Sequence, residues 1–145
     1  MQEARYAGPL RLDAALSKLV LGEGASAAFT RDGPRADNEY RDLGWAAATA
    51  GAVGARHIRA IRPFEQPTGW HWHDMTAHFV VVLKGWITFR YEGADEPVTV
   101  RAGDTLSQPA GVPHNVVARS DDMELIEINV PASFGTWELL AGGSQ

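Results

Sequence analysis

Hydrophobic and polar positions along most of the chain follow the short, turn-punctuated pattern of β-strands. Runs of β-branched and aromatic residues alternate with clusters of glycine, proline and aspartate, about 8–12 residues apart. Expected strands cover residues 57–61, 79–83, 86–91, 98–100, 112–117 and 123–130. Because many short strands at this spacing are typical of sandwiches and barrels, the pattern predicts an antiparallel, all-β domain.

The first part of the chain has a different pattern. Residues 13–21 are rich in alanine, leucine and lysine, which favours a short helix with Asp13 as its N-cap. Residues 31–38 are polar and turn-rich, and we expect them to form a loop. We therefore expect an N-terminal arm over residues 1–38, a barrel over residues 39–135 and a C-terminal tail over residues 136–145.

Composition narrows the chemistry. The 145 residues suit one domain, and 45% of them are hydrophobic, which supports a packed core. Cysteine is absent, so a metal must be held by nitrogen or oxygen ligands. A net charge of −5 argues against nucleic acid as a partner. Without a signal-peptide run or an apolar stretch of about 18 residues, we expect a cytoplasmic protein and no membrane partner.

Four of the five histidines lie in two short segments. His71 and His73 are two residues apart, so on a strand they share one face. His78 can return to that face at the start of the next strand, and His114 belongs to the second segment. Imidazole is the commonest nitrogen ligand for transition metals. Taken alone, the His71/His73 pair is equally compatible with two polar side chains on a solvated face.

The two segments together resemble the two motifs of the cupin superfamily. The motifs read G-x5-H-x-H-x3-4-E-x6-G and G-x5-P-x-G-x2-H-x3-N, and every spacing from residue 71 to residue 114 agrees. The matching positions are His71, His73, His78, Gly85, Gly103, Pro109, Gly111 and His114. The resemblance covers roughly residues 57–132. It implies an antiparallel jelly-roll β-barrel with a short N-terminal arm or helix, and one divalent transition metal held inside by His71, His73, His78 and His114.

The sequence departs from the motifs at three positions. Glu65 replaces the leading glycine of the first motif, and Ala118 replaces the final asparagine of the second. His78 stands where the first motif has glutamate, either as a fourth ligand or as a spectator. Four neutral imidazoles would leave the full +2 charge on the ion, which favours an anionic or chelating small-molecule substrate.

Other residues are weaker candidates. Gln108 precedes Pro109 and could hydrogen-bond a ligand. Glu127 lies in an apolar strand, where a buried carboxylate is costly without a partner, so it is exposed, supports a metal ligand from behind, or is an acid/base group. Val80 and Val82 share the parity of His78 and would line an apolar pocket. Trp72 has the opposite parity to the two motif histidines and is expected to pack outside the barrel.

The resemblance implies an oxidoreductase of the dioxygenase kind, with Fe(II) favoured and Zn, Ni and Mn as alternatives. A second reading is a non-redox isomerase or lyase, with Glu127 as base. A third is a non-enzymatic module that binds a metal or a small ligand. Fold alone does not choose among them. Because open sheets leave edges that need covering, we also expect a homodimer that uses residues 1–38 and Trp72.

Overall fold

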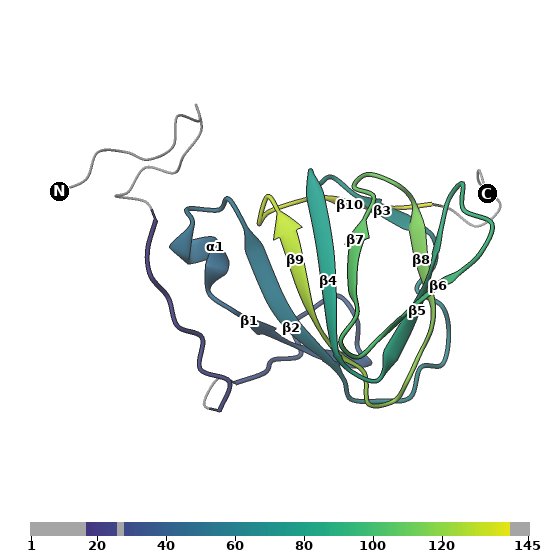
Figure 1. Ribbon diagram of the computed structural model, residues 1–145, viewed down its shortest axis with the longest axis horizontal. Coiled ribbons are helices and arrows are strands. Elements are labelled where there is room, and N and C mark those ends of the chain that lie inside the picture. The colour runs from purple at the N-terminus through teal and green to yellow at the C-terminus, as the bar shows by residue number, and fades with distance from the viewer. Residues whose placement is uncertain (1–16, 26–27, 140–145) are drawn as a thin grey trace.

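The computed structural model describes residues 17–25 and 28–139, and almost all of its regular structure is antiparallel strand. Figure 1 shows two sheets that curve around a shared interior. One sheet has the order β1-β2-β9-β4-β7 and the other has the order β10-β3-β8-β5-β6. The elements are β1 (Asn38–Asp42), α1 (Trp45–Ala48), β2 (Gly54–Ala60), β3 (His71–His73), β4 (Ala77–Lys84), β5 (Trp86–Tyr91), β6 (Val98–Arg101), β7 (Thr105–Gln108), β8 (His114–Arg119), β9 (Glu124–Val130) and β10 (Thr136–Glu138).

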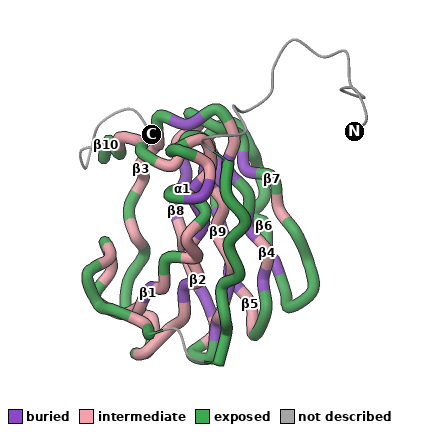
Figure 2. The backbone as a smooth tube through the Cα atoms, turned by 90° about the vertical axis from the view of Figure 1, so that its left-hand side faces the viewer, coloured by how far each residue is buried: buried purple, intermediate pink, exposed green. Residues whose placement is uncertain are grey.

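Alternation of side chains along the strands decides what faces the interior. In β4, His78, Val80 and Val82 are buried, whereas Phe79 and Leu83 are exposed. Figure 2 shows the same alternation as short buried stretches along the strands. The buried apolar residues of both sheets form one core between them. Its members are Tyr40, Ile58, Val80, Val82, Ile87, Phe89, Tyr91, Val100, Met123 and Leu125. The antiparallel all-β barrel predicted from the sequence is therefore confirmed.

The turn between β4 and β5 depends on Gly85. This residue has a φ of 67°, in the left-handed region that favours glycine. A Cβ atom at this position would lie 2.1 Å from Ser120 Oγ and 2.6 Å from Asp122 Oδ1. Both the backbone conformation and the close approach of the loop before β9 thus require glycine here.

The N-terminal segment differs from its expectation. The helix predicted over residues 13–21 is wrong for residues 17–21, which have no regular structure, and residues 13–16 lie outside the described part. The Lys18 amide donates to the Ala48 carbonyl, but Leu19 and Leu21 are exposed. A helix this short is unstable without an apolar face packed against the domain, and Leu19 and Leu21 supply no such packing. No helix in the described ranges is long and apolar enough to cross a membrane.

Two strands extend beyond the expected limits of the barrel. Strand β1 begins at Asn38, and Tyr40 in it also pairs with Thr30 of the arm. Strand β10 lies in the segment expected to be a tail, yet it pairs with β3 residue for residue. Trp137 of β10 stacks on Trp72 of β3, with ring centroids 4.6 Å apart. This cross-strand pair holds β10 in place, and its three residues are too few for a sequence pattern to reveal.

Candidate metal centre

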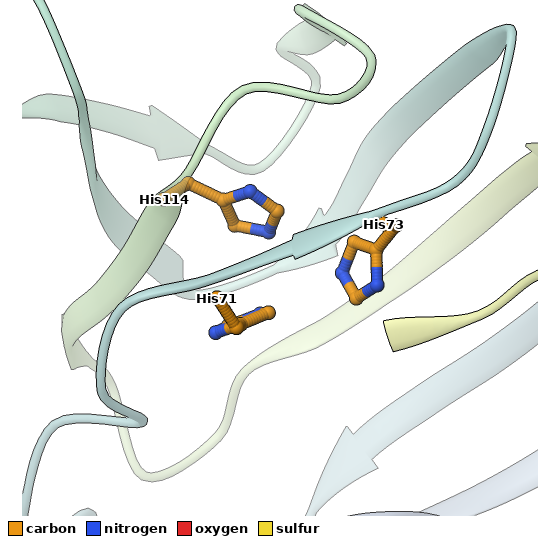
Figure 3. Close-up of side chains that lie close together, drawn as sticks. All are labelled: His71, His73 and His114. Atoms are coloured by element: carbon orange, nitrogen blue, oxygen red, sulfur yellow. The ribbon is translucent and has the colours of Figure 1, made fainter. Parts of the chain in front are cut away.

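Three of the four motif histidines converge at one place. Strand β3 carries His71 and His73, and β8 carries His114 directly opposite His71. One ring nitrogen from each lies within 4.8 Å of the other two. The rings approach from two neighbouring strands toward one space (Figure 3). Strand parity thus brings His71 and His73 to the same face, and strand pairing adds His114.

Each ring of this triad is held through its Nδ1 atom. Nδ1 of His71 lies 2.8 Å from the Gly69 carbonyl oxygen, and Nδ1 of His114 lies 3.1 Å from the Val112 carbonyl oxygen. Nδ1 of His73 lies 2.8 Å from Thr136 Oγ1. A carbonyl only accepts, so the contacts of His71 and His114 favour the tautomer with hydrogen on Nδ1 and a lone pair on Nε2, whereas the Thr136 hydroxyl can accept from or donate to Nδ1 of His73. Such contacts orient metal-binding histidines, and the triad therefore fits a divalent transition metal.

Burial favours the neutral form of two of these rings. The pKa of His73 falls to about 4, first because burial penalises the charged ring and then because His71 and His78 lie nearby. The pKa of His114 also falls to about 4, mainly through burial, although its hydrogen bond to the Val112 carbonyl acts in the opposite direction. Metal binding requires neutral imidazole, so these two rings need no deprotonation at neutral pH.

His78 lies beside the triad, and its Nε2 is occupied by another partner. Its ring centroid lies 5.5 Å from that of His73 and 6.1 Å from that of His114. Its Nε2 lies 3.0 Å from Glu127 Oε2, and the group of nitrogens within 4.8 Å of one another does not include it. The coordination of a metal by His78 therefore stays a prediction.

Glu127 is neither exposed nor alone. Its Oε1 accepts a hydrogen bond of 2.6 Å from Arg56 Nη2, and its Oε2 faces His78. Burial raises the pKa of Glu127, but the hydrogen bond with His78 and the charge of Arg56 outweigh burial and lower that pKa to about 2. Glu127 is thus a buried carboxylate whose charge is balanced by Arg56. It has the partner without which burial of a carboxylate is costly.

Gln108 lies opposite His78 on the neighbouring strand β7 and is buried. Its Oε1 accepts a hydrogen bond of 2.9 Å from the Tyr91 hydroxyl, and its Nε2 lies 3.5 Å from His78 Nε2. Burial raises the pKa of Tyr91, which keeps the hydroxyl protonated as a donor. Gln108 is thereby positioned beside the histidines, with its amide held in one orientation.

A cavity of about 400 Å³ connects these groups. All four motif histidines line it, as do Gln108 and Glu127, so the six candidate residues border one space. Val80 also lines this cavity as expected, whereas Val82 lies in the core beside it.

Sequence reasoning missed three contributors to the site: Thr136, Arg56 and Tyr91. Thr136 holds His73, Arg56 balances Glu127, and Tyr91 holds Gln108. The apolar strand around Glu127 did signal that a cationic partner was needed. No signal identified Arg56 as that partner, because the two residues meet through the pairing of β2 with β9.

A family model for the cupin domain matches residues 59–130, about half of the chain. The chain belongs to the cupin superfamily, as the two histidine motifs predicted. A search of curated protein sequences found no match.

Solved structures of low sequence identity share the fold. KdgF from Halomonas sp. is 18% identical with a TM-score of 0.61, over 77% of this chain and 94% of that one. The polyketide cyclase RemF from Streptomyces resistomycificus is 16% identical with a TM-score of 0.66, over 85% and 87% of the two chains. The Bacillus subtilis oxalate decarboxylase, which has Mn(II) centres, is 15% identical with a TM-score of 0.58, over 73% of this chain and 29% of that one. These likenesses support the jelly-roll fold.

Proposed function

We propose that the protein is a metal-dependent cupin enzyme of the dioxygenase kind that acts on a small oxygenated organic molecule. The observation that carries the proposal is the convergence of three histidines, each held through Nδ1, on a cavity of about 400 Å³. In this proposal His71, His73 and His114 would hold one divalent ion, and His78 would be the fourth ligand. Such an ion supplies Lewis acidity and, if it is iron, redox chemistry.

The charges around the site support an anionic or chelating substrate. Imidazole ligands are neutral, so they leave the charge of the ion uncompensated. The carboxylate in contact with His78 is Glu127, and Arg56 balances its charge at 2.6 Å. A substrate that brings its own negative charge to the ion is therefore favoured. Fe(II) is our first choice of metal, and Zn, Ni and Mn are alternatives because nitrogen sites bind all of them.

The test begins with the metal content of protein expressed without added metal. The apoprotein is then loaded with Fe(II), and oxygen consumption is measured with a series of small enolisable carbonyl compounds. We expect one bound ion per chain and substrate-dependent oxygen uptake, both lost in His73→Ala. If the protein binds metal but consumes no oxygen with any compound, the dioxygenase proposal is contradicted, whereas the proposed metal centre is supported.

The position of Glu127 favours a second candidate, a non-redox isomerase or lyase. Glu127 lines the cavity as a carboxylate, the form that accepts a proton, and its low pKa makes it a weak base that would need a substrate carbon acidified by the metal ion. This candidate predicts exchange of substrate protons with deuterated water, without oxygen, in the Zn(II)-loaded protein. A protein that binds metal and ligands but shows neither activity would be a binding module.

We also propose a homodimer in which the arm covers the partner. Leu19 and Leu21 are exposed in a segment with no regular structure, and Phe79 and Leu83 are exposed on the outer face of β4. Phe79 and Leu83 share one face of β4, and a contiguous exposed apolar surface marks an interaction site in soluble proteins. Light scattering at micromolar concentration should give twice the mass of one chain, and a monomer would contradict the proposal.

A further inference from the structure

Apolar side chains from both sheets line the cavity beyond the histidines. Ile58 on β2, Val80 on β4 and Leu125 on β9 form one wall. Phe89 on β5 and Val116 on β8 belong to the opposite sheet. The cavity therefore continues from the metal-binding end into the space between the sheets, where these five side chains cannot form hydrogen bonds with a polar ligand.

The charged residues of the cavity leave no unpaired cation there. Arg35 and Arg119 both contact Asp37, at 3.3 and 3.1 Å, and Arg56 contacts Glu127. The lining holds three arginines and three carboxylates, and the third carboxylate, Glu138, lies opposite His71 at the metal-binding end, so Arg35 and Arg119 share Asp37 alone. A second anionic group on a ligand would gain nothing from the apolar part of these walls.

We infer that the natural substrate has an oxygen-chelating head, which meets the ion, and an uncharged aromatic or aliphatic body, which fills the apolar part of the cavity. This inference rests on the proposed function, and it names the substrate class. A volume of about 400 Å³ lies within the range of pockets that enclose ligands larger than a two-carbon acid. Val116 follows His114 by two residues on the same face of β8, so the body would begin about 7 Å from that ligand.

Two β-diketones that share one chelating head test the inference. Acetylacetone carries two methyl groups, and in benzoylacetone a phenyl group replaces one of them. Both are titrated by calorimetry into Zn(II)-loaded protein, since zinc has no redox chemistry to consume them. We expect benzoylacetone to bind at least about tenfold more tightly, because its phenyl group leaves water for the apolar walls.

Substitutions in β8 separate the contribution of the cavity from the intrinsic effect of the phenyl group on zinc affinity. Val116→Phe places a larger side chain in the apolar part of the cavity, so the preference for benzoylacetone should fall at least about fivefold. The affinities for zinc and for acetylacetone should stay within about twofold of those of the wild type. Val117→Phe is the matched control, because Val117 is also half-buried but does not line the cavity. Thermal unfolding verifies that each variant folds. If Val116→Phe does not fold, the milder Val116→Leu should lower the preference in the same direction.

The possible results separate the inference from the proposed function. If the protein binds no zinc, the proposed function fails and the inference fails with it. If zinc binds but the two diketones bind equally, or Val116→Phe leaves the preference unchanged, the inference alone is overturned. A preference that Val116→Phe removes and Val117→Phe keeps supports it.

Discussion

At the scale of single residues, the candidate centre depends on which nitrogen of each histidine is held. The Nδ1 atoms of His71 and His114 are held by carbonyls two residues earlier in the chain, at Gly69 and Val112. His73 differs, because its Nδ1 contact comes from Thr136 on another strand. Strand parity placed His71 and His73 on one face, and the motif resemblance added His114. Neither could reveal these contacts, since carbonyl positions depend on the local backbone and Thr136 lies 63 residues away from His73.

Thr136→Val should weaken metal binding by about tenfold. Valine has nearly the same shape as threonine but cannot form a hydrogen bond, so the His73 ring loses the contact that fixes its orientation. Competition with a chromogenic zinc chelator measures the affinity. Thr136→Ser keeps the hydroxyl and should bind zinc nearly as tightly as the wild type. Equal losses in both variants would assign the effect to packing rather than to the hydrogen bond.

The motif spacing makes His78 a metal ligand, whereas the group of nitrogens within 4.8 Å of one another contains only His71, His73 and His114. If His78 is the fourth ligand, as proposed, His78→Ala should lower zinc affinity at least about tenfold, and His73→Ala about 100-fold or more because it removes a member of the triad. His57→Ala is the control, since His57 contacts Glu124 and Arg41 and does not line the cavity. Zinc affinity unchanged in His78→Ala would make His78 a spectator whose role is to hold Glu127.

At the scale of elements, the sequence predicted the strands that carry strong alternation and missed those that do not. The expected strand at residues 86–91 coincides with β5, and the expected strand at 79–83 lies within β4. Alternation of apolar and polar residues predicts these strands because one face of each strand is buried. Strands β1, β7 and β10 were missed, because β1 is polar, β7 has only four residues and β10 has three exposed residues. Their strand conformation depends on pairing with neighbours, which a local pattern does not contain.

Gly85→Ala should lower the free energy of unfolding by about 2–3 kcal/mol, measured by urea denaturation. The substitution forces a left-handed backbone on alanine and drives its Cβ into Ser120 and Asp122. Gly93→Ala is the matched control, because Gly93 has a φ of 83° but no atom within 4 Å of an added Cβ. It should cost only about 1 kcal/mol. If both variants lose the same free energy of unfolding, the side chains of Ser120 and Asp122 move away from the added Cβ at Gly85 without destabilising the fold.

At the scale of the whole molecule, the site depends on sheet order. His78, Glu127 and Arg56 lie on β4, β9 and β2, which are neighbours in one sheet although Arg56 and Glu127 are 71 residues apart in sequence. Cupin motif spacing identified His78 but carried no information on this contact. The sequence could show that Glu127 needs a partner, whereas the identity of that partner required the register of three strands.

The outer face of the same sheet links stability to pH through His57. Its ring contacts Glu124 at 2.9 Å and Arg41 at 3.1 Å, with Phe29 packed against it and Arg59 nearby. Burial lowers the pKa of His57 below its usual 6.5, against the opposing hydrogen bond that its ring donates to Glu124, and Arg41 adds to the lowering. As pH falls through about 6.5, the unfolded chain therefore binds a proton at this position before the folded protein does.

This difference should make the folded protein less stable at pH 5.5 than at pH 7.5. His57 contributes at most about 1.4 kcal/mol per pH unit, the limit for one proton. His57→Gln has no proton to bind in this range, so its free energy of unfolding should fall less over the same interval. Urea denaturation of metal-free protein at the two pH values measures both slopes, and comparison with the wild type removes the contribution of every other titrating group. A variant whose stability falls as steeply as that of the wild type would mean that the folded and unfolded states protonate His57 equally.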